Sequence, residues 1–274
     1  MSARRLALIT GASAGIGAAF AQAYARRNWD IALTARRGDR LEALAQRLAG
    51  AHGVSAWVIP ADLADPQAPD AILAALRRQA AREPDALVNN AGYGPTSTFA
   101  GSDWAEQVGF MQVMMTAPAA LTHACLPGML ARGYGRIIQV ASIAGLAPGM
   151  PSMTLYGAVK AFLIRFAQAL NLECAGSGVH ISALCPGLTY SEFHDANRTR
   201  AQLSRIPKPF WAEADAVAEA AIAAVERNQA VFVPGAVNKL MTALLRLTPE
   251  PLTEAAMKRT LKRLGPDRGA NSKD

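Results

Sequence analysis

The sequence predicts an α/β protein with a doubly wound parallel sheet of about seven strands, covered by helices on both faces. Short apolar runs recur along the chain, helical segments separate them, and this alternation extends over nearly the whole length. The 274 residues fit one large domain. A hydrophobic fraction of 51%, against 18% charged residues, supplies a sizeable core.

The expected strands are runs of four to eight residues that are apolar without alternation. Such runs are typical of parallel strands buried on both faces. We place them at residues 6–10, 31–34, 54–60, 86–89, 136–141, 179–185 and 230–233. Residues 40–51 and 69–82 carry apolar side chains at three- and four-residue spacing, which predicts crossover helices.

The charge pattern and the metal-ligating residue types exclude some classes of function. The formal charge of +7 suits an anionic partner, but the basic residues are scattered and form no stripe interleaved with aromatic residues, so we expect no nucleic acid. The three cysteines and four histidines lie apart without metal-ligand spacing, so we expect no metal site and a reduced, cytoplasmic setting. No continuous apolar stretch has the roughly 20 residues that a membrane span needs.

A glycine-rich turn follows the first strand and opens a helix that extends to about residue 27. Glycines there let the backbone approach a pyrophosphate, and the helix N-terminus offers free N–H groups and partial positive charge. The alternative is a loop that merely needs positive φ angles. The flanking strand and helix favour a Rossmann-type dinucleotide site at Gly11, Ser13, Ala14, Gly15, Ile16 and Gly17.

The end of the second strand points to the phosphorylated form of the dinucleotide. Arg36 and Arg37 stand where proteins that favour NAD usually place an acid for the ribose 2′-hydroxyl. Guanidinium groups instead form charge-assisted hydrogen bonds with a 2′-phosphate. We therefore expect NADP(H) in preference to NAD(H); the alternative is a solvated start of the next helix.

Tyr156 and Lys160 lie four residues apart, which places both on one face of a helix. A free tyrosine has a pKa of about 10, and a nearby ammonium favours the phenolate and lowers that value. Ser142 ends the fifth apolar run, at the sheet edge where parallel sheets bind ligands. On this interpretation Tyr156 is an acid catalyst and Ser142 holds a substrate oxygen. The alternative is a surface pair on an amphipathic helix.

Taken together, these motifs resemble the short-chain dehydrogenase/reductase family over roughly residues 4–234. The motifs occur in family order: the glycine turn, Asp62-Leu63, Asn89-Asn90-Ala91-Gly92, Ser142, Tyr156, Lys160 and Pro186-Gly187. The resemblance implies hydride transfer between a nicotinamide and a carbonyl carbon, while Tyr156 exchanges a proton with the oxygen. It also implies that Lys160 lowers the pKa of the tyrosine and binds the ribose, and that Ser142 orients the carbonyl.

The resemblance further implies cofactor contacts beyond the glycine turn. Asp62 with Leu63 would meet the adenine, and Asn90, Ala91 and Gly92 would line the adenosine side. Pro186, Gly187, Thr189 and Ser191 would embrace the nicotinamide. One position departs from the family: counting back from Leu126-Pro127 places Met114 where an asparagine is usual. This departure motivates a second hypothesis, an NADP-binding sensor or scaffold with little turnover.

The expected organisation is a dinucleotide-binding and catalytic domain at residues 1–235, with a substrate lid at about 190–212. An amphipathic helical extension covers 236–265, and 266–274 form a disordered tail. The partner is a small carbonyl or alcohol that the sequence does not name. Relatives commonly form homodimers or homotetramers through residues 106–132 and 152–176. Membrane contact through the basic C-terminal helix is a less favoured alternative to docking on the domain or a sister subunit.

Overall fold

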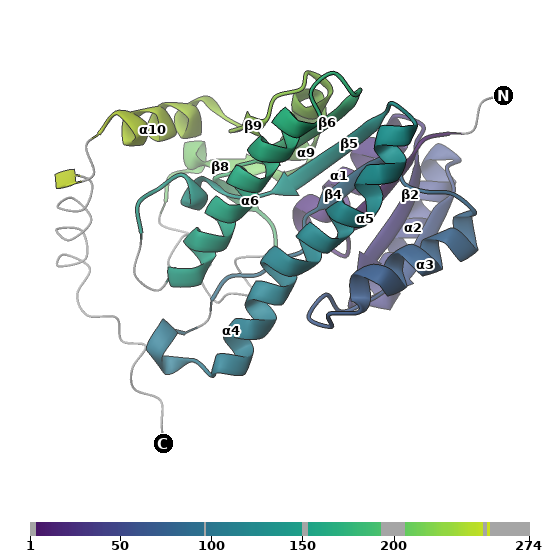
Figure 1. The fold of residues 1–274 in the computed structure, drawn as a ribbon, viewed down its shortest axis with the longest axis horizontal. Coiled ribbons are helices and arrows are strands. Elements are labelled where there is room, and N and C mark those ends of the chain that lie inside the picture. The colour runs from purple at the N-terminus through teal and green to yellow at the C-terminus, as the bar shows by residue number, and fades with distance from the viewer. Residues whose placement is uncertain (1–3, 96, 150–152, 193–205, 249–250, 253–274) are drawn as a thin grey trace.

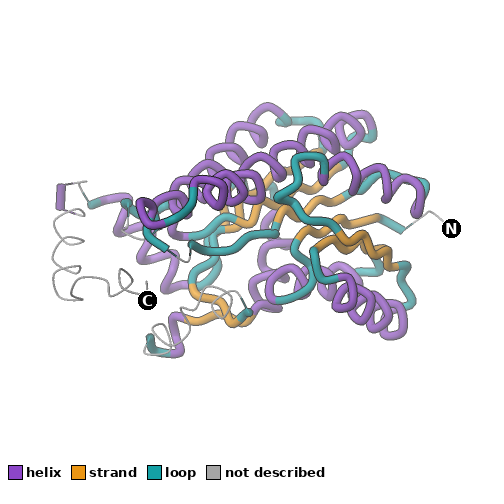
Figure 2. The backbone as a smooth tube through the Cα atoms, turned by 90° about the horizontal axis from the view of Figure 1, so that it is seen from below, coloured by secondary structure: helices purple, strands orange, loops and turns teal. Residues whose placement is uncertain are grey.

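The computed structural model describes residues 4–95, 97–149, 153–192, 206–248 and 251–252. The expected tail, the extension beyond residue 252 and most of the expected lid lie outside these residues. The described part is a Rossmann-type sheet between two layers of helices (Figures 1 and 2). The predicted fold class is confirmed.

Seven strands form the main sheet in the order β3-β2-β1-β4-β5-β6-β9, and every neighbouring pair is parallel. The strand order reverses between β1 and β4, which opens a crevice at their carboxyl ends. The strands are β1 Leu6–Thr10, β2 Asp30–Ala35, β3 Ala56–Pro60, β4 Ala86–Asn89, β5 Gly135–Val140, β6 Val179–Leu184 and β9 Val231–Phe232.

The helices divide into two layers, each with its own apolar core. One core packs the sheet against α1 Gly15–Arg26, α2 Gly38–His52 and α9 Ala214–Glu226. The opposite core packs it against α3 Ala68–Ala80, α4 Trp104–Met111, α5 Ala117–Ala131 and α6 Thr154–Glu173. Burial on both faces explains why the strands are apolar without alternation.

Four elements differ from the expectation. Two short strands, β7 Leu188–Tyr190 and β8 Trp211–Glu213, pair in parallel at the two ends of the expected lid. A π-helical turn, Gln112–Thr116, joins α4 to α5. The continuous helical stretch Trp104–Ala131 is long and apolar enough to cross a membrane by length and composition, although polar residues interrupt its apolar sequence. Its buried side chains belong to the domain core, so it is a core helix.

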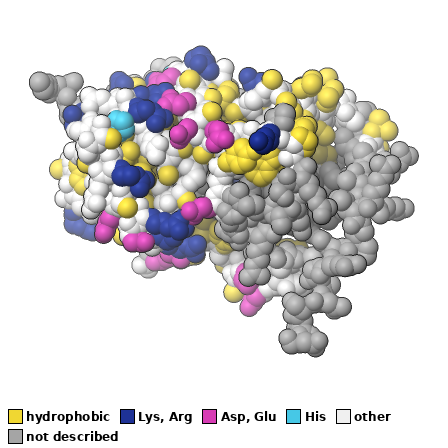
Figure 3. Space-filling model, turned by 180° about the vertical axis from the view of Figure 1, so that it is seen from behind, with side chains coloured by type: hydrophobic (Ala, Val, Ile, Leu, Met, Phe, Trp, Pro, Cys, Tyr) yellow, Lys and Arg dark blue, Asp and Glu magenta, His cyan; other side chains and the backbone are white. Residues whose placement is uncertain are grey.

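The last described helix is α10 Ala236–Leu247, at the far end of the sheet beyond β9 (Figure 1). Asn238 and Thr242 are buried, whereas Leu240, Leu244 and Leu247 are exposed. The helix therefore docks by its polar residues and leaves an apolar face uncovered by the described chain. On the reverse side of the molecule, basic and acidic side chains lie interspersed over the described surface (Figure 3).

Candidate active site

The glycine turn is fixed by hydrogen bonds between the ends of β1 and β4. The Asn90 side-chain amide donates to the carbonyls of Thr10 (2.9 Å) and Gly11 (3.2 Å). The backbone N–H groups of Asn90 and Ala91 donate to the Thr10 hydroxyl at 2.9 and 3.0 Å. Gly11 has a φ of +65°, which a residue with a side chain rarely adopts. The amide of Asn90 is thus engaged by the turn itself, and its contact with the adenosine stays a prediction.

Helix α1 begins at this turn, and its first backbone N–H groups can donate hydrogen bonds to a ligand. Ala14 precedes it, and no described side chain caps the helix or places an acid in its first turn. The first N–H groups of a helix lack partners within the helix and carry partial positive charge. This donor set fits the diphosphate of a dinucleotide.

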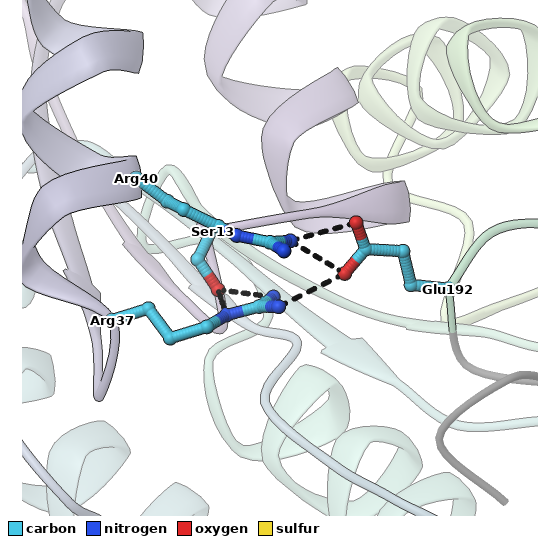
Figure 4. Close-up of polar contacts among 4 residues, drawn as sticks. All are labelled: Ser13, Arg37, Arg40 and Glu192. Carbon is cyan, nitrogen blue, oxygen red and sulfur yellow. Dashed lines mark hydrogen bonds and ion pairs between the residues drawn. The ribbon is translucent and has the colours of Figure 1, made fainter.

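The arginines that end β2 point in different directions. Arg36 lines a cavity that also contains Tyr93, after β4. Arg37 instead donates to the Ser13 hydroxyl through Nε (3.2 Å) and Nη2 (2.9 Å) (Figure 4). Its third nitrogen, Nη1, lies 3.0 Å from a carboxylate oxygen of Glu192. Arg37 therefore contacts the glycine turn, whereas Arg36 lines the cavity that Tyr156 also lines.

Ser142, Tyr156 and Lys160 come together at the carboxyl end of β5. Ser142 caps a short 3₁₀ turn, Ile143–Gly145, and its hydroxyl accepts from the N–H of Ala144 at 3.1 Å. Gly145 lets this turn lie against the backbone of α6, because a Cβ there would come within 2.5 Å of the carbonyl carbon of Lys160. This close packing brings Ser142 into a side-chain hydrogen bond with Tyr156.

Lys160 is buried and bound to the sheet. Its Nζ donates to the carbonyl of Val140 at 2.7 Å and lies 5.6 Å from the centre of the Tyr156 ring. Burial lowers the pKa of Lys160 to about 8. The group therefore changes charge in a pH range where an enzyme is readily assayed.

The pKa of Tyr156 corrects one expectation. Burial raises it to about 12, and the hydrogen bond with Ser142 offsets only part of that shift. The net shift is upward, whereas the sequence led us to expect a lowering by Lys160. Loss of water around the phenol is the largest cause of the shift. At neutral pH the phenol of Tyr156 is therefore protonated.

Met114 lies in the π-helical turn between α4 and α5 and is 1% exposed. A Cβ on Gly92 would come within 2.6 Å of its sulfur, so the thioether packs directly on the β4 loop. Gln112 begins the same turn but is only half-buried. The side chain at this buried position is therefore a thioether, which is only a weak hydrogen-bond acceptor.

A cavity of about 360 Å³ opens beside Tyr156. Its wall is mainly aromatic and aliphatic, with charge from Arg36 and Glu106. The apolar lining includes Tyr93, Phe99, Phe110 and Leu155. Tyr156 therefore lines a space of small-molecule size with a largely apolar wall.

The other predicted residues border the same crevice. Asp62 is exposed and caps its own turn by accepting from the N–H of Ala64, while Leu63 is buried. Pro186 accepts from Ile143 N–H at 3.1 Å, which ties its turn to the one that carries Ser142. Thr189 lies buried on β7, and Ser191 follows that strand. Their contacts with a cofactor remain predictions.

Three residues near the site escaped the sequence analysis. Arg40 and Glu192 form an ion pair, and Asn238 of α10 packs on Gly187, where a Cβ would lie 2.6 Å from its side-chain oxygen. No local signal marks Glu192 or Asn238, because their partners lie far away in the sequence.

A glycine turn fixed at the switch point and a Ser–Tyr–Lys group at the same sheet edge define a Rossmann-type oxidoreductase. The sequence model described as short chain dehydrogenase matches residues 5–202. The chain belongs to this short-chain dehydrogenase/reductase family.

Relatives and solved structures extend the match. Sulfoacetaldehyde reductase of Chromohalobacter salexigens is 38% identical over 190 residues, covering 68% of this chain and 72% of that protein. An uncharacterized oxidoreductase of Myxococcus xanthus is 32% identical over 256 residues, covering 93% and 97%. A short-chain dehydrogenase from Sphingobium yanoikuyae, solved in complex with NADPH, superposes with a TM-score of 0.76 at 31% identity, covering 98% and 99%. The bulky-bulky ketone specific alcohol dehydrogenase from Comamonas testosteroni gives 0.73 at 29%, covering 98% and 97%.

Proposed function

We propose that this protein is an NADP(H)-dependent oxidoreductase that interconverts a carbonyl and a secondary alcohol, with Tyr156 as the general acid/base. The carrying observation is the hydrogen-bonded Ser142–Tyr156 pair beside Lys160, at the wall of a cavity and at the sheet edge that bears the glycine turn. A proton donor, an oxygen-orienting hydroxyl and a diphosphate site thus converge on one crevice.

In carbonyl reduction, NADPH held at the glycine turn would supply a hydride to the carbonyl carbon. Tyr156 donates its phenolic proton to the carbonyl oxygen, and Ser142 holds that oxygen in line. The high pKa of Tyr156 keeps this proton in place before reaction. Charged Lys160 then stabilises the phenolate that remains, since an ammonium near a phenolate favours the ionised form. In the reverse direction the phenolate accepts the alcohol proton.

The test follows the absorbance of NADPH and of NADH with a panel of ketones, aldehydes and oxo acids. The panel must span small anionic aldehydes and bulky ketones, because the relatives include a sulfoacetaldehyde reductase and a bulky-ketone alcohol dehydrogenase. The aromatic wall of the cavity favours substrates with an apolar substituent. We expect NADPH-dependent reduction of at least one such carbonyl. Binding of NADPH without turnover over the whole panel would contradict the proposal.

A second candidate is an NADP-binding sensor or scaffold protein, and buried Met114 favours it. Replacement of protons at Tyr156 needs a path to solvent, and a thioether offers only a weak acceptor for a water on that path. The two candidates differ in one observable. The sensor binds NADPH and reduces nothing, whereas the enzyme does both.

The preference for NADP rests on the basic end of β2. Arg37 contacts Ser13 of the glycine turn, Arg36 directly precedes Arg37 in the sequence, and β2 ends without an acid. For Arg36→Asp we expect the ratio of kcat/KM for NADPH to that for NADH to fall by about 10- to 100-fold, since a charge-assisted contact is lost and a repulsion is added. Steady-state kinetics with both cofactors measure this ratio. An unchanged ratio would remove Arg36 from the phosphate site.

The rate of carbonyl reduction should fall in alkaline solution. Lys160 is charged below its pKa of about 8 and neutral above it, while Tyr156 stays protonated up to about 12. If the ammonium is required, kcat/KM falls by about tenfold per pH unit above about pH 8. A profile measured from about pH 6 to 10, with folding checked by circular dichroism, tests this. A flat profile would mean that the charge of Lys160 does not limit catalysis.

We also propose a cytoplasmic homo-oligomer, a dimer or a tetramer. Exposed apolar side chains on the α4 and α6 helices support the assembly, among them Trp104, Val108 and Leu172. Val108 and Leu172 lie within the two segments, 106–132 and 152–176, through which relatives of this kind are expected to associate, and Trp104 lies two residues before the first.

A further inference from the structure

The carboxylate of Glu192 forms ion pairs with Arg37 and Arg40 beside the glycine turn. One of its carboxylate oxygens lies 3.0 Å from Arg37 Nη1, and Arg40 Nη1 donates to both oxygens at 2.7 and 2.8 Å (Figure 4). The remaining nitrogens of the Arg37 guanidinium are bound to Ser13. A single carboxylate therefore joins two cations that the β2–α2 connection and the start of α2 place side by side.

The backbone brings this carboxylate to the turn. Glu192 comes two residues after β7, and the preceding Ser191 packs on the glycine turn, where a Cβ on Gly15 would lie 2.9 Å from the Cβ of Ser191. The arginines hold the pKa of Glu192 below its usual range, through hydrogen bonds from Arg37 first and Arg40 second. The group is thus an anion near neutral pH, seated on donors that suit an anionic ligand.

We propose that Glu192 is a specificity-determining residue, an internal anion that the 2′-phosphate of NADP(H) must displace from Arg37 and Arg40. This inference rests on the proposed function in one respect, the assignment of the β2 arginines to the 2′-phosphate. The inference adds two residues to that site: Glu192 as the competing anion and Arg40 as a second arginine for the phosphate. A cofactor without the phosphate leaves the Glu192 ion pairs in place.

The effect of Glu192 on the affinity for a 2′-phosphate should be small, and its direction follows from the charges. All three side chains are partly exposed, Arg37 at 43%, Arg40 at 44% and Glu192 at 51%, so water screens their attraction. A phosphate carries more charge than a carboxylate and three acceptor oxygens, so it wins the exchange. Because exposed ion pairs are weak, removing the competitor should tighten binding of a 2′-phosphate by about three- to tenfold.

A different role for Glu192 makes the opposite prediction. If its ion pairs persist when a cofactor is bound, they form a clasp across the adenosine site, and removing the carboxylate weakens binding. The geometry favours displacement, because Arg37 has all three nitrogens engaged by Ser13 and Glu192. Without displacement, a new anion on Arg37 has only the two remaining N–H donors and lies beside the carboxylate of Glu192, which repels it.

The experiment compares binding of 2′,5′-ADP and 5′-AMP to the full-length protein by isothermal titration calorimetry. These ligands differ only in the 2′-phosphate and need no catalysis. For Glu192→Gln we expect the Kd of 2′,5′-ADP to fall by about three- to tenfold and that of 5′-AMP to stay within about twofold. In the combined variant with Arg40→Gln the gain from Glu192→Gln should shrink, since its partner is gone.

Glu219 provides a matched control. It joins Arg26 and Arg27 at 2.8 and 2.5 Å on the α1–α9 surface, is 37% exposed, and its pKa is likewise held low by two arginines. Glu219→Gln removes the same charge and should change neither Kd. Equal tightening of 2′,5′-ADP by both variants would assign the effect to net charge and overturn the proposal.

The remaining outcomes separate this inference from the proposed function. Unchanged or weaker binding of 2′,5′-ADP by Glu192→Gln overturns the competition, even if the wild type reduces carbonyls with NADPH. Tightening of 2′,5′-ADP alone supports the competition, even if no carbonyl is reduced. If the wild type and Glu192→Gln both bind the two ligands equally, the phosphate site and the competition fail together.

Discussion

Replacement of Tyr156 by phenylalanine should reduce carbonyl turnover by at least about 100-fold, because a positioned acid contributes on the order of 10² to 10⁴ in rate. The ring still fills its buried place, and only the hydroxyl that bonds to Ser142 is lost. We therefore expect the fold to persist and the Kd of NADPH to change by less than about twofold. Stopped assays with high enzyme concentration quantify the residual rate, and fluorescence titration gives the Kd.

Tyr134→Phe serves as the control for this change. Its hydroxyl lies 3.5 Å from Glu226 at the far end of β5, away from the crevice. Turnover in this variant should match the wild type. If Tyr156→Phe keeps more than about a tenth of the activity, the general-acid role passes to another group and the proposed mechanism is wrong.

Alanine at Gly17 should abolish dinucleotide binding and destabilise the domain. A Cβ there would lie 2.3 Å from the carbonyl oxygen of Gly11 and 2.5 Å from the side-chain nitrogen of Asn90. Both atoms belong to the hydrogen-bonded turn, so neither moves without breaking it. Overpacking of this kind costs about 1 to 3 kcal/mol, and a displaced turn removes the phosphate donors. Thermal unfolding and NADPH titration measure the two effects.

The matched control is Gly50→Ala in helix α2, where an added Cβ meets no atom within 4 Å. Alanine favours a helix over glycine, so this variant should be as stable as the wild type or more stable by about 0.5 to 1 kcal/mol. Normal NADPH binding by Gly17→Ala would show that the turn adapts and that its geometry is not required.

Much of the fold was readable from the sequence because its signals are local. Residues 6–10 were expected as a strand and form β1 with every side chain buried. The π-helical turn at Gln112–Thr116 was missed, since a single shifted hydrogen-bond register within a helix leaves no compositional signal. Strands β7 and β8 were missed because each is only three residues long and their pairing spans more than twenty residues.

The site was predictable to the extent that its residues belong to contiguous motifs. The spacing of Tyr156 and Lys160 predicted that they share a helix face, and both lie buried on α6. The pKa of Tyr156 was not predictable, because burial of its hydroxyl depends on how α6 packs against the 3₁₀ turn after β5. The Glu192–Arg37 ion pair joins residues 155 positions apart, and only the folded chain brings them together.

The packing of helix α10 on the domain indicates how far along the chain the residues that support the site extend. The family match ends at residue 202, yet Asn238 packs on Gly187 and donates to the carbonyl of Pro234 at 3.0 Å. The turn expected to face the nicotinamide is thus buttressed by a segment that begins 34 residues beyond that match. We therefore expect a minimal functional unit to extend through Thr242, whose hydroxyl donates to the Asn238 carbonyl at 2.9 Å.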